Sequence, residues 1–173
     1  SKPLLEQSLA LLKMTLHEND EEIAKGSTYL ADVFKNVGKT SLALKLTKDA
    51  TKIYRIVYGS CNSHVIQSLI IESTLQSKLS NHDMAKSILI ECLSLTQQLY
   101  GEEHEEVANV LSALAWVYKY DGDYSNAKKT HEKSLGMRIK LFGENHPTVA
   151  SSLSDIGDLM EALGKYNDAC SLH

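Results

Sequence analysis

One segment of the chain occurs twice with little change. FGENHPTVA begins at Phe142 and YGEEHEEVA at Tyr100, a separation of 142 − 100 = 42 residues. The same step leads back to Tyr58-Gly59 and then to Leu16, so four landmarks follow one period. A fixed period of roughly 20 to 50 residues is typical of arrays in which one supersecondary unit stacks on the next. Every other pattern in the sequence is therefore interpreted within this repeat.

Each period contains the pattern of two helices joined by a tight turn. In the clearest unit, apolar residues recur at helical spacing from Val107 to Tyr118. Asp121-Gly122-Asp123 interrupts this pattern, because glycine readily takes the positive φ at which helices end. A second helical pattern then begins at Tyr124 and ends before Gly143. The spacing predicts helices over residues 1–16, 22–37, 40–58, 64–79, 82–99, 106–121, 124–141, 148–163 and 166–173.

Small residues recur where the two helices of a unit must come close, since a close approach leaves no room for larger side chains. On the first helices the small residues are Ala31, Ser73, Ala115 and Gly157. On the second helices they are Ala43, Ala85, Ala127 and Ala169, followed seven residues later by Ala50, Cys92 and Ser134. The turn residues Gly38, Ser80, Gly122 and Gly164 keep the same register. These series predict stacked helix pairs.

The series Leu111, Leu114-Ala115, Tyr118, Gly122, Tyr124 and Ala127 resembles the tetratricopeptide repeat, and it recurs from Leu153 to Ala169. The usual period of that repeat is about 34 residues. The longer period with its FGENHPTVA joint is similar to the kinesin-light-chain type. The resemblance implies an all-α, right-handed superhelical solenoid of stacked antiparallel helix pairs. A single array is expected over 1–173, with full repeats at 22–58, 64–100 and 106–142 and truncated repeats at 1–16 and 148–173.

Composition excludes several classes of function. The net charge is −4, whereas a nucleic-acid binder usually carries an excess of basic residues. No apolar run approaches the ~18 residues of a membrane span, and the first residues lack the cleavage pattern of a signal peptide. Cys61, Cys92 and Cys170 are odd in number and show no paired spacing, so neither a disulfide framework nor a cysteine-based zinc site is predicted. We expect a cytoplasmic protein that contacts neither nucleic acid nor membrane.

Two short motifs resemble sites of chemistry. NVGKTS at 36–41 ends like a phosphate-binding loop, but that loop needs a glycine where Val33 stands, and a strand before it. CNSH at 61–64 offers Cys61 and His64 as ligands, and no second pair completes a tetrahedral site. His104 and His146 share one register at the joint, which indicates a structural or capping role. No enzyme, metal or cofactor is expected.

The family resemblance implies a peptide groove lined by the first helix of each pair. The residues expected to line it are Lys25, Thr28, Asp32, Lys35, Gln67, Lys78, Asn109, Ser112, Trp116, Lys119, Ser151 and Asp158. Among the groove residues of the repeats at 22–58, 64–100 and 106–142, lysines outnumber acidic residues, so an acidic peptide would be attracted. Trp116 is the only tryptophan and could anchor a ligand side chain. The alternative is that the lysines are solvated and Trp116 packs between helices.

Two functions remain open. One is a non-catalytic protein–protein interaction module that binds a protein segment or peptide, for which acidic character is expected, in the groove. The other is a structural scaffold or self-association segment of a larger multidomain protein. Apolar residues in the end units, among them Leu4, Leu12 and Ile156, predict weak self-association. The asparagine ladder of kinesin light chains is not matched, and Asn109 lies off that ladder.

Overall fold

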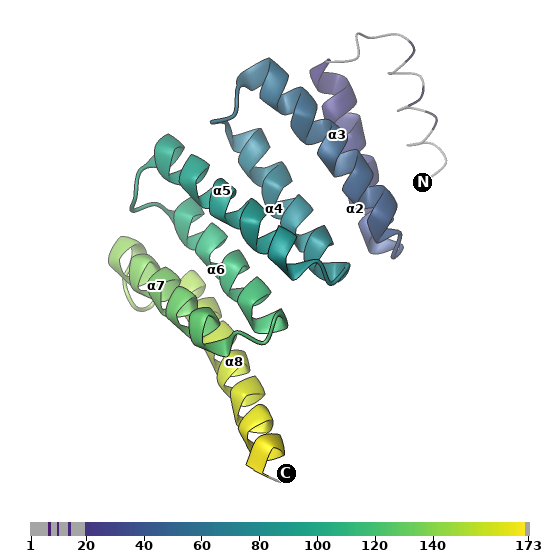
Figure 1. Cartoon of the computed structure of the whole chain (residues 1–173). Helices are drawn as coiled ribbons and strands as arrows, with labels where there is room; N and C mark the ends of the chain where they lie inside the picture. Colours follow the sequence, from purple (N-terminus) through teal and green to yellow (C-terminus); the bar gives the residue numbers. More distant parts are fainter. Residues whose placement is uncertain (1–6, 8–9, 11–13, 15–19, 172–173) are drawn as a thin grey trace. The chain divides into compact units, whose positions relative to one another are not determined.

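All regular structure in the part of the chain that the structure describes is helical. The computed structural model describes residues 7, 10, 14 and 20–171, with the backbone alone for 165–171. The helices, labelled in Figure 1, are α2 (Glu21–Asn36), α3 (Thr40–Tyr58), α4 (Ser63–Lys78), α5 (His82–Tyr100), α6 (Glu105–Tyr120), α7 (Tyr124–Phe142) and α8 (Pro147–Ser171). The helices predicted from 22–37 through 124–141 agree to within one residue at each end. The prediction for 1–16, with its leucines, falls largely outside the described residues.

The predicted turn at Gly164 is wrong, because α8 runs without a break through this residue to Ser171. A glycine inside a helix costs only about 1 kcal/mol relative to alanine. Helical backbone can therefore continue through Gly164 at a small cost in free energy.

The prediction that Gly157 lies at a close contact between two helices is also wrong. It is exposed, and a Cβ atom added there would meet no atom within 4 Å. The contact needs a second helix that folds back over α8, and α8 continues straight instead. The other small residues of the first helices, Ala31, Ser73 and Ala115, are buried as predicted.

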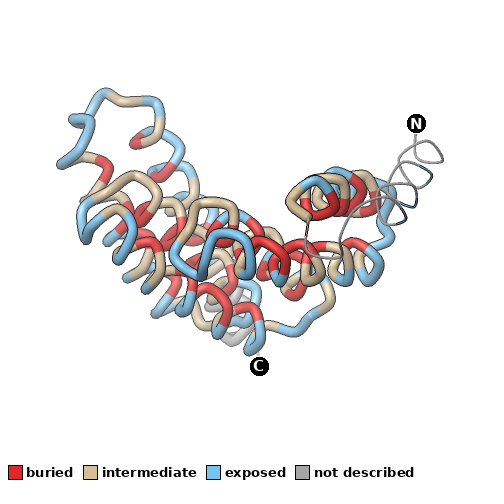
Figure 2. The backbone as a smooth tube through the Cα atoms, turned by 90° about the horizontal axis from the view of Figure 1, so that it is seen from above, coloured by how far each residue is buried: buried red, intermediate tan, exposed pale blue. Residues whose placement is uncertain are grey.

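The chain forms two compact units, residues 1–99 and 100–173. In the first unit α2 packs against α3, and α3 packs against α4. In the second unit α6 packs against α7, and α7 against α8. Buried positions follow one side of each helix (Figure 2). The small residues of the second helices have no exposed surface: Ala43, Ala50, Ala85, Cys92, Ala127 and Ser134.

The turn between the helices of a pair has the same hydrogen bonds in three repeats. After α6, the Gly122 amide donates to the carbonyl of Lys119 at 3.1 Å, and the Asp123 amide to that of Tyr118 at 2.9 Å. Gly122 has φ 81°, a left-handed conformation that glycine adopts without steric cost. Ser80 takes φ 61° at the equivalent position after α4. The turn geometry is therefore kept even where the glycine is replaced.

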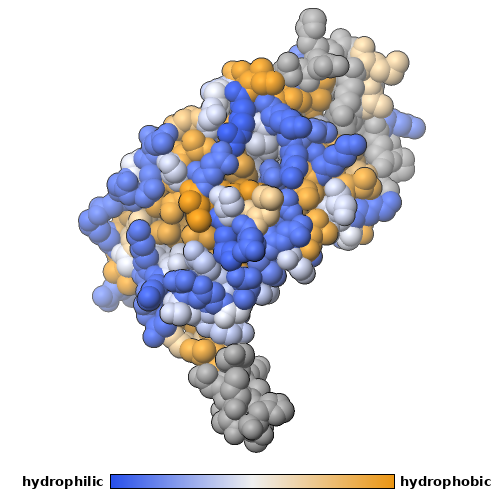
Figure 3. Space-filling view, in the orientation of Figure 1, coloured by the Kyte–Doolittle hydropathy of each residue, from blue (hydrophilic) through white to orange (hydrophobic). Residues whose placement is uncertain are grey.

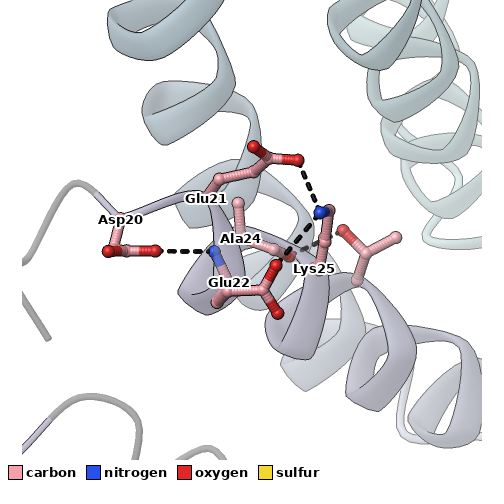
Figure 4. Close-up of polar contacts among 6 residues, drawn as sticks. Asp20, Glu21, Glu22, Ala24 and Lys25 are labelled. Carbon is pink, nitrogen blue, oxygen red and sulfur yellow. Dashed lines mark hydrogen bonds and ion pairs between the residues drawn. The ribbon is translucent and has the colours of Figure 1, made fainter. Parts of the chain in front are cut away.

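The start of each first helix is capped at one register position. Asp20, Asn62, His104 and His146 lie 42 residues apart in sequence, and each side chain accepts from the backbone amide two residues later. The distances from acceptor to amide nitrogen are 3.0, 2.9, 3.1 and 3.3 Å in chain order. Figure 4 shows the Asp20 cap of α2. Of the structural or capping role predicted for His104 and His146, the structure shows capping.

Ala127 provides a test of the packing register. Its side chain is fully buried between α6 and α7. Replacing it with leucine would force the two helices apart, so we expect Ala127→Leu to lower the free energy of unfolding by about 1–3 kcal/mol. Denaturant unfolding followed by circular dichroism measures this change. Ala150→Leu, at an exposed position of α8, is the control, and equal stability of both variants would contradict the register.

Candidate functional site

One side of every first helix is free of contacts that bury it. The positions are 25, 29, 32 and 36 in α2 and their equivalents at 42-residue steps in α4, α6 and α8. All of them are exposed or half-buried. We call these positions the first-helix row. Those expected from the sequence that lie on the row are Lys25, Asp32, Gln67, Lys78, Asn109, Trp116, Ser151 and Asp158.

The remaining expected residues lie beside the row. Thr28 donates from Oγ1 to the carbonyl of Ala24 at 2.9 Å, and Lys35 is paired with Asp32 at 2.5 Å. Ser112 is a correction, because its side chain is 9% exposed and bonds the Ser134 hydroxyl of α7 at 2.9 Å. It faces the partner helix of its own pair. A ligand on the row would not reach it.

The sequence reasoning missed Tyr29, which is 69% exposed at a row position of α2. Its spacing could have revealed it, since Lys25, Tyr29, Asp32 and Asn36 follow the i, i+4, i+7, i+11 pattern of one helix face. The prediction instead placed Thr28 on that face. Asp155 of α8 was missed for the same reason.

The lysines of α2 are neutralised within the helix. Lys25 Nζ lies 2.6 Å from a carboxylate oxygen of Glu21 and 3.0 Å from one of Glu22 (Figure 4). The hydrogen bond with Glu21 is the main cause that raises the pKa of Lys25 above its usual range. Lys35 likewise lowers the pKa of Asp32. The attraction of α2 for an acidic ligand is therefore much weaker than the lysine count suggests.

Trp116 is the centre of an aromatic and cationic cluster in the second unit. Tyr120 stacks on it with ring centroids 6.0 Å apart, and Lys119 Nζ lies 4.5 Å from the centroid of its ring. The His131 ring of α7 meets it edge-on at 5.8 Å and 87°. Trp116 is half-buried and Tyr120 is 64% exposed. The cluster thus offers an accessible aromatic surface with a cation beside it.

The buried side of α7 behind this cluster is unusually polar. Its members are Ala127, His131, Ser134 and Arg138. Ser134 donates to the carbonyl of Ala108 at 2.7 Å. Arg138, 7% exposed, donates from Nη2 to Asn109 Oδ1 at 2.9 Å and from Nη1 to the Ser152 hydroxyl. Burial lowers the pKa of Arg138, and Asp155 and Glu105 oppose that shift.

His131 is 1% exposed, and neither ring nitrogen has a hydrogen-bond partner among the described residues. Burial lowers the pKa of His131. Asp155 acts in the opposite direction, while Lys119 and Arg138 add to the lowering. The imidazole is therefore held neutral against Trp116.

The two motifs that resemble catalytic or metal sites, at 36–41 and 61–64, have structural roles in the fold. Gly38 lies in the turn between α2 and α3 with φ 76°. Cys61 Sγ lies 3.6 Å from the carbonyl of Leu95, and His64 stacks on Tyr54 and Tyr58. Within the described residues no group of three or more His, Cys, Asp or Glu could hold a metal ion. A search of the same residues found no helix with the length and apolarity of a membrane span.

Comparison with protein families gives a match to the tetratricopeptide repeat. The family model matches residues 74–140 and 121–173. The matched residues together make up more than half of the 173-residue chain. No curated protein matches the sequence at a significant level.

Solved structures share the fold. BtubC (BKLC) from P. vanneervenii is 22% identical with a TM-score of 0.79, over 98% of this chain and 68% of that one. A putative kinesin light chain from Podosopora anserina, whose own TPR-like repeats are nearly identical to one another, is 19% identical to this chain. Its TM-score is 0.81, over 99% of this chain and 81% of that one. A Rap protein complexed with Competence and Sporulation Factor is 18% identical with a TM-score of 0.74, over 98% of this chain and 45% of that one. The fold is thus an all-α solenoid of the kind found in kinesin-light-chain-like arrays.

The buried histidine predicts a pH-dependent stability. The pKa of His131 is lowered in the folded state, so the unfolded chain binds more protons below about pH 6.5. Its contribution is fully present above that pH and is lost as the pH falls through the folded value. Leu89 occupies the same register position in the preceding repeat. We expect wild type to lose more stability than His131→Leu between about pH 7 and pH 5, measured by denaturant unfolding. Parallel pH profiles for the two proteins would contradict this assignment.

Proposed function

Since the chain belongs to the tetratricopeptide repeat family, we propose that it is a non-catalytic protein–protein interaction module that binds a peptide or protein segment at the first-helix row positions of a single unit. The observation that carries the proposal is the recurrence of exposed or half-buried residues at the same positions of four first helices. Helical repeats present such surfaces to extended ligands. The matched Rap structure holds Competence and Sporulation Factor, which supports ligand binding as a use of this fold.

The ligand is proposed to contact the Trp116 cluster. A half-buried tryptophan flanked by an exposed tyrosine resembles the aromatic anchors of protein interfaces. Lys119 beside the ring has no ion pair with a described residue, and neither has Lys78 of α4. An acidic residue of a ligand would gain more at either of these lysines, each within its own unit, than at Lys25 or Lys35, which already have partners. Acidic character is thus proposed for part of the ligand.

Self-association of a scaffold is the second candidate, and it rests on α8. Leu153 and Met160 are 55% and 37% exposed. Leu111, the equivalent of Leu153 in α6, is 3% exposed because α7 covers it. An apolar face at a core register position favours contact with another helix.

The exposed Cys61 thiol forms no disulfide with a described cysteine. This supports the reducing, cytoplasmic setting that forms part of this proposal.

The contributions of Trp116 and Lys119 to binding affinity can be separated by their dependence on salt concentration. Acidic peptides from a synthetic array are the probes, and isothermal titration measures their affinity. We expect Trp116→Ala to weaken binding by about 2 kcal/mol at every salt concentration, with partial rescue in Trp116→Phe. Lys119→Ala should weaken binding chiefly below ~0.1 M salt, because ions screen an exposed charge. Lys129→Ala, at an exposed position of α7, is the matched control. Equal binding by wild type and both alanine variants would reject the row as the ligand surface.

The α8 face predicts a change in oligomeric state. Fully burying Leu153 and Met160 together would stabilise a contact by ~3–6 kcal/mol, and loss of rotational and translational freedom offsets part of this gain. We expect weak association, with a dissociation constant of about a millimolar or higher. Sedimentation over a concentration series measures it. Leu153→Glu should remain monomeric, while Leu42→Glu, at a 46% exposed leucine of α3, should associate like wild type. A monomeric wild type throughout the series would rule out this candidate.

A further inference from the structure

We propose that the outer side of α7 is a second docking surface, which takes an acidic α-helical segment of a partner protein across Gly136. The outer side lies opposite the buried residues of α7, and its members are Ser125, Lys129, Glu132, Lys133, Gly136 and Lys140. All of them are exposed. The surface belongs to a second helix, so it is separate from the first-helix row and does not need a ligand there.

Positive charge is concentrated on this helix. Residues 100–173 include seven basic and twelve acidic side chains. Four of the seven basic side chains are exposed lysines of α7, at positions 128, 129, 133 and 140, whereas α7 has one acidic residue, Glu132. Figure 3 shows hydrophilic side chains on the visible face of α7. A basic surface on an otherwise acidic unit favours a partner whose negative charge is complementary.

Two of these lysines are available to such a partner. Among the described residues neither Lys129 nor Lys133 has an ion-pair partner, while Lys128 lies 3.8 Å from Glu132 and Lys140 pairs with Glu103. Lys129 and Lys133 are four residues apart, so they lie one above the other on the helix surface. Acidic residues of a partner would pair with them without breaking an ion pair of the fold.

Gly136 gives the surface a point of close approach. It lies in the interior of α7, where glycine is among the least favourable residues for a helix. Its φ is not positive, and a Cβ atom added there would meet no atom within 4 Å. The fold of this chain therefore does not require glycine at this position. A helix docked from outside would benefit from it, because helices come close where the side chain at the crossing is small.

The other second helices lack this combination. At 42-residue steps, the positions of Lys129, Lys133 and Gly136 hold other residues: Ser87, Glu91 and Ser94 in α5, and Lys45, Asp49 and Lys52 in α3. Glu91 already pairs with Arg55 at 2.6 Å. A structural requirement of the repeat would recur at these positions, so the combination on α7 indicates a role particular to that helix.

The charge pattern favours a short acidic helix over a nucleic acid. A protein that binds nucleic acid neutralises many phosphates with lysine and arginine, and the twelve acidic residues of the same unit would repel a polyanion. Lys133 and Lys140 lie on either side of Gly136, about 10 Å apart along the helix axis. A crossing helix with a few acidic residues on one face reaches this local positive charge and avoids the rest of the unit.

The experiment selects helical peptides on the whole chain. A phage library displays an alanine-rich helix of about 20 residues with one face randomised. An excess of a soluble double variant, Lys129→Glu with Lys133→Glu, removes peptides that bind elsewhere, including those on the first-helix row. We expect the remaining peptides to carry several Asp or Glu residues on one face. They should bind wild type at least tenfold more tightly than the double variant at ~0.05 M salt, and the ratio should fall at higher salt.

Gly136→Gln tests the close approach. Glutamine is a good helix former, so the unfolding midpoint should rise, whereas its side chain blocks the crossing and should weaken the selected peptides by about tenfold. Weaker binding by a more stable protein separates docking from damage to the fold. Ser94→Gln, at the same register in α5, is the matched control for size, and Lys45→Glu with Lys52→Glu on α3 is the control for charge. Both controls should bind like wild type.

The outcomes distinguish this inference from the proposed function. If no peptide remains in the presence of the double variant, the lysines of α7 are merely solvated and the docking surface is overturned. Peptides selected without the double variant still test the first-helix row in that case. Equal binding by wild type and Gly136→Gln would overturn a helix that crosses α7. A random-sequence DNA duplex that displaces the selected peptides from wild type would overturn the choice of a protein partner.

Discussion

The close contact between the two helices of each pair is the constraint on which the rest of the structure depends. Ala43, Ala85 and Ala127 have no exposed surface, and they share one register position. A side chain larger than alanine there would separate the helices. The contact sets which side of each first helix is buried, and it thereby determines which side remains as the first-helix row. Packing and ligand surface are two consequences of the same helix register.

The repeat conserves backbone geometry while the chemistry that supports it varies. A carboxylate, an amide and two imidazoles accept the same hydrogen bond at the start of the four first helices. The repeat at 64–100 departs most from the repeat pattern, with Ser80 at its turn, yet its polar residues have partners. Asn81 donates to the buried Gln76 at 3.0 Å, and Lys48 lies 3.6 Å from Glu72. Local hydrogen bonds thus compensate for core residues that the pattern lacks.

The sequence was sufficient to predict the described helices up to the start of α8, because spacing and turn residues determine a helix pair locally. The continuation of α8 through Gly164 was not predictable in this way, since the turn depends on the helix that would pack after it. Ser112 was misplaced because its role depends on Ser134, 22 residues away. The same limit explains the lysines: Glu21 and Glu22 pair with Lys25 only once α2 has formed. Side-chain partners across or along a helix, unlike the helices themselves, require the three-dimensional arrangement.

The capping residues also differ between the two units in their chemistry. His104 and His146 accept the amide hydrogen bond through Nδ1, so the proton of each neutral ring lies on Nε2. Asp20 and Asn62 accept through a side-chain oxygen instead. The histidine caps therefore belong to the unit that also buries His131. Each of them has a second ring nitrogen that can donate one further hydrogen bond, which the carboxylate of Asp20 cannot do, so the starts of α6 and α8 combine an acceptor and a donor in one side chain.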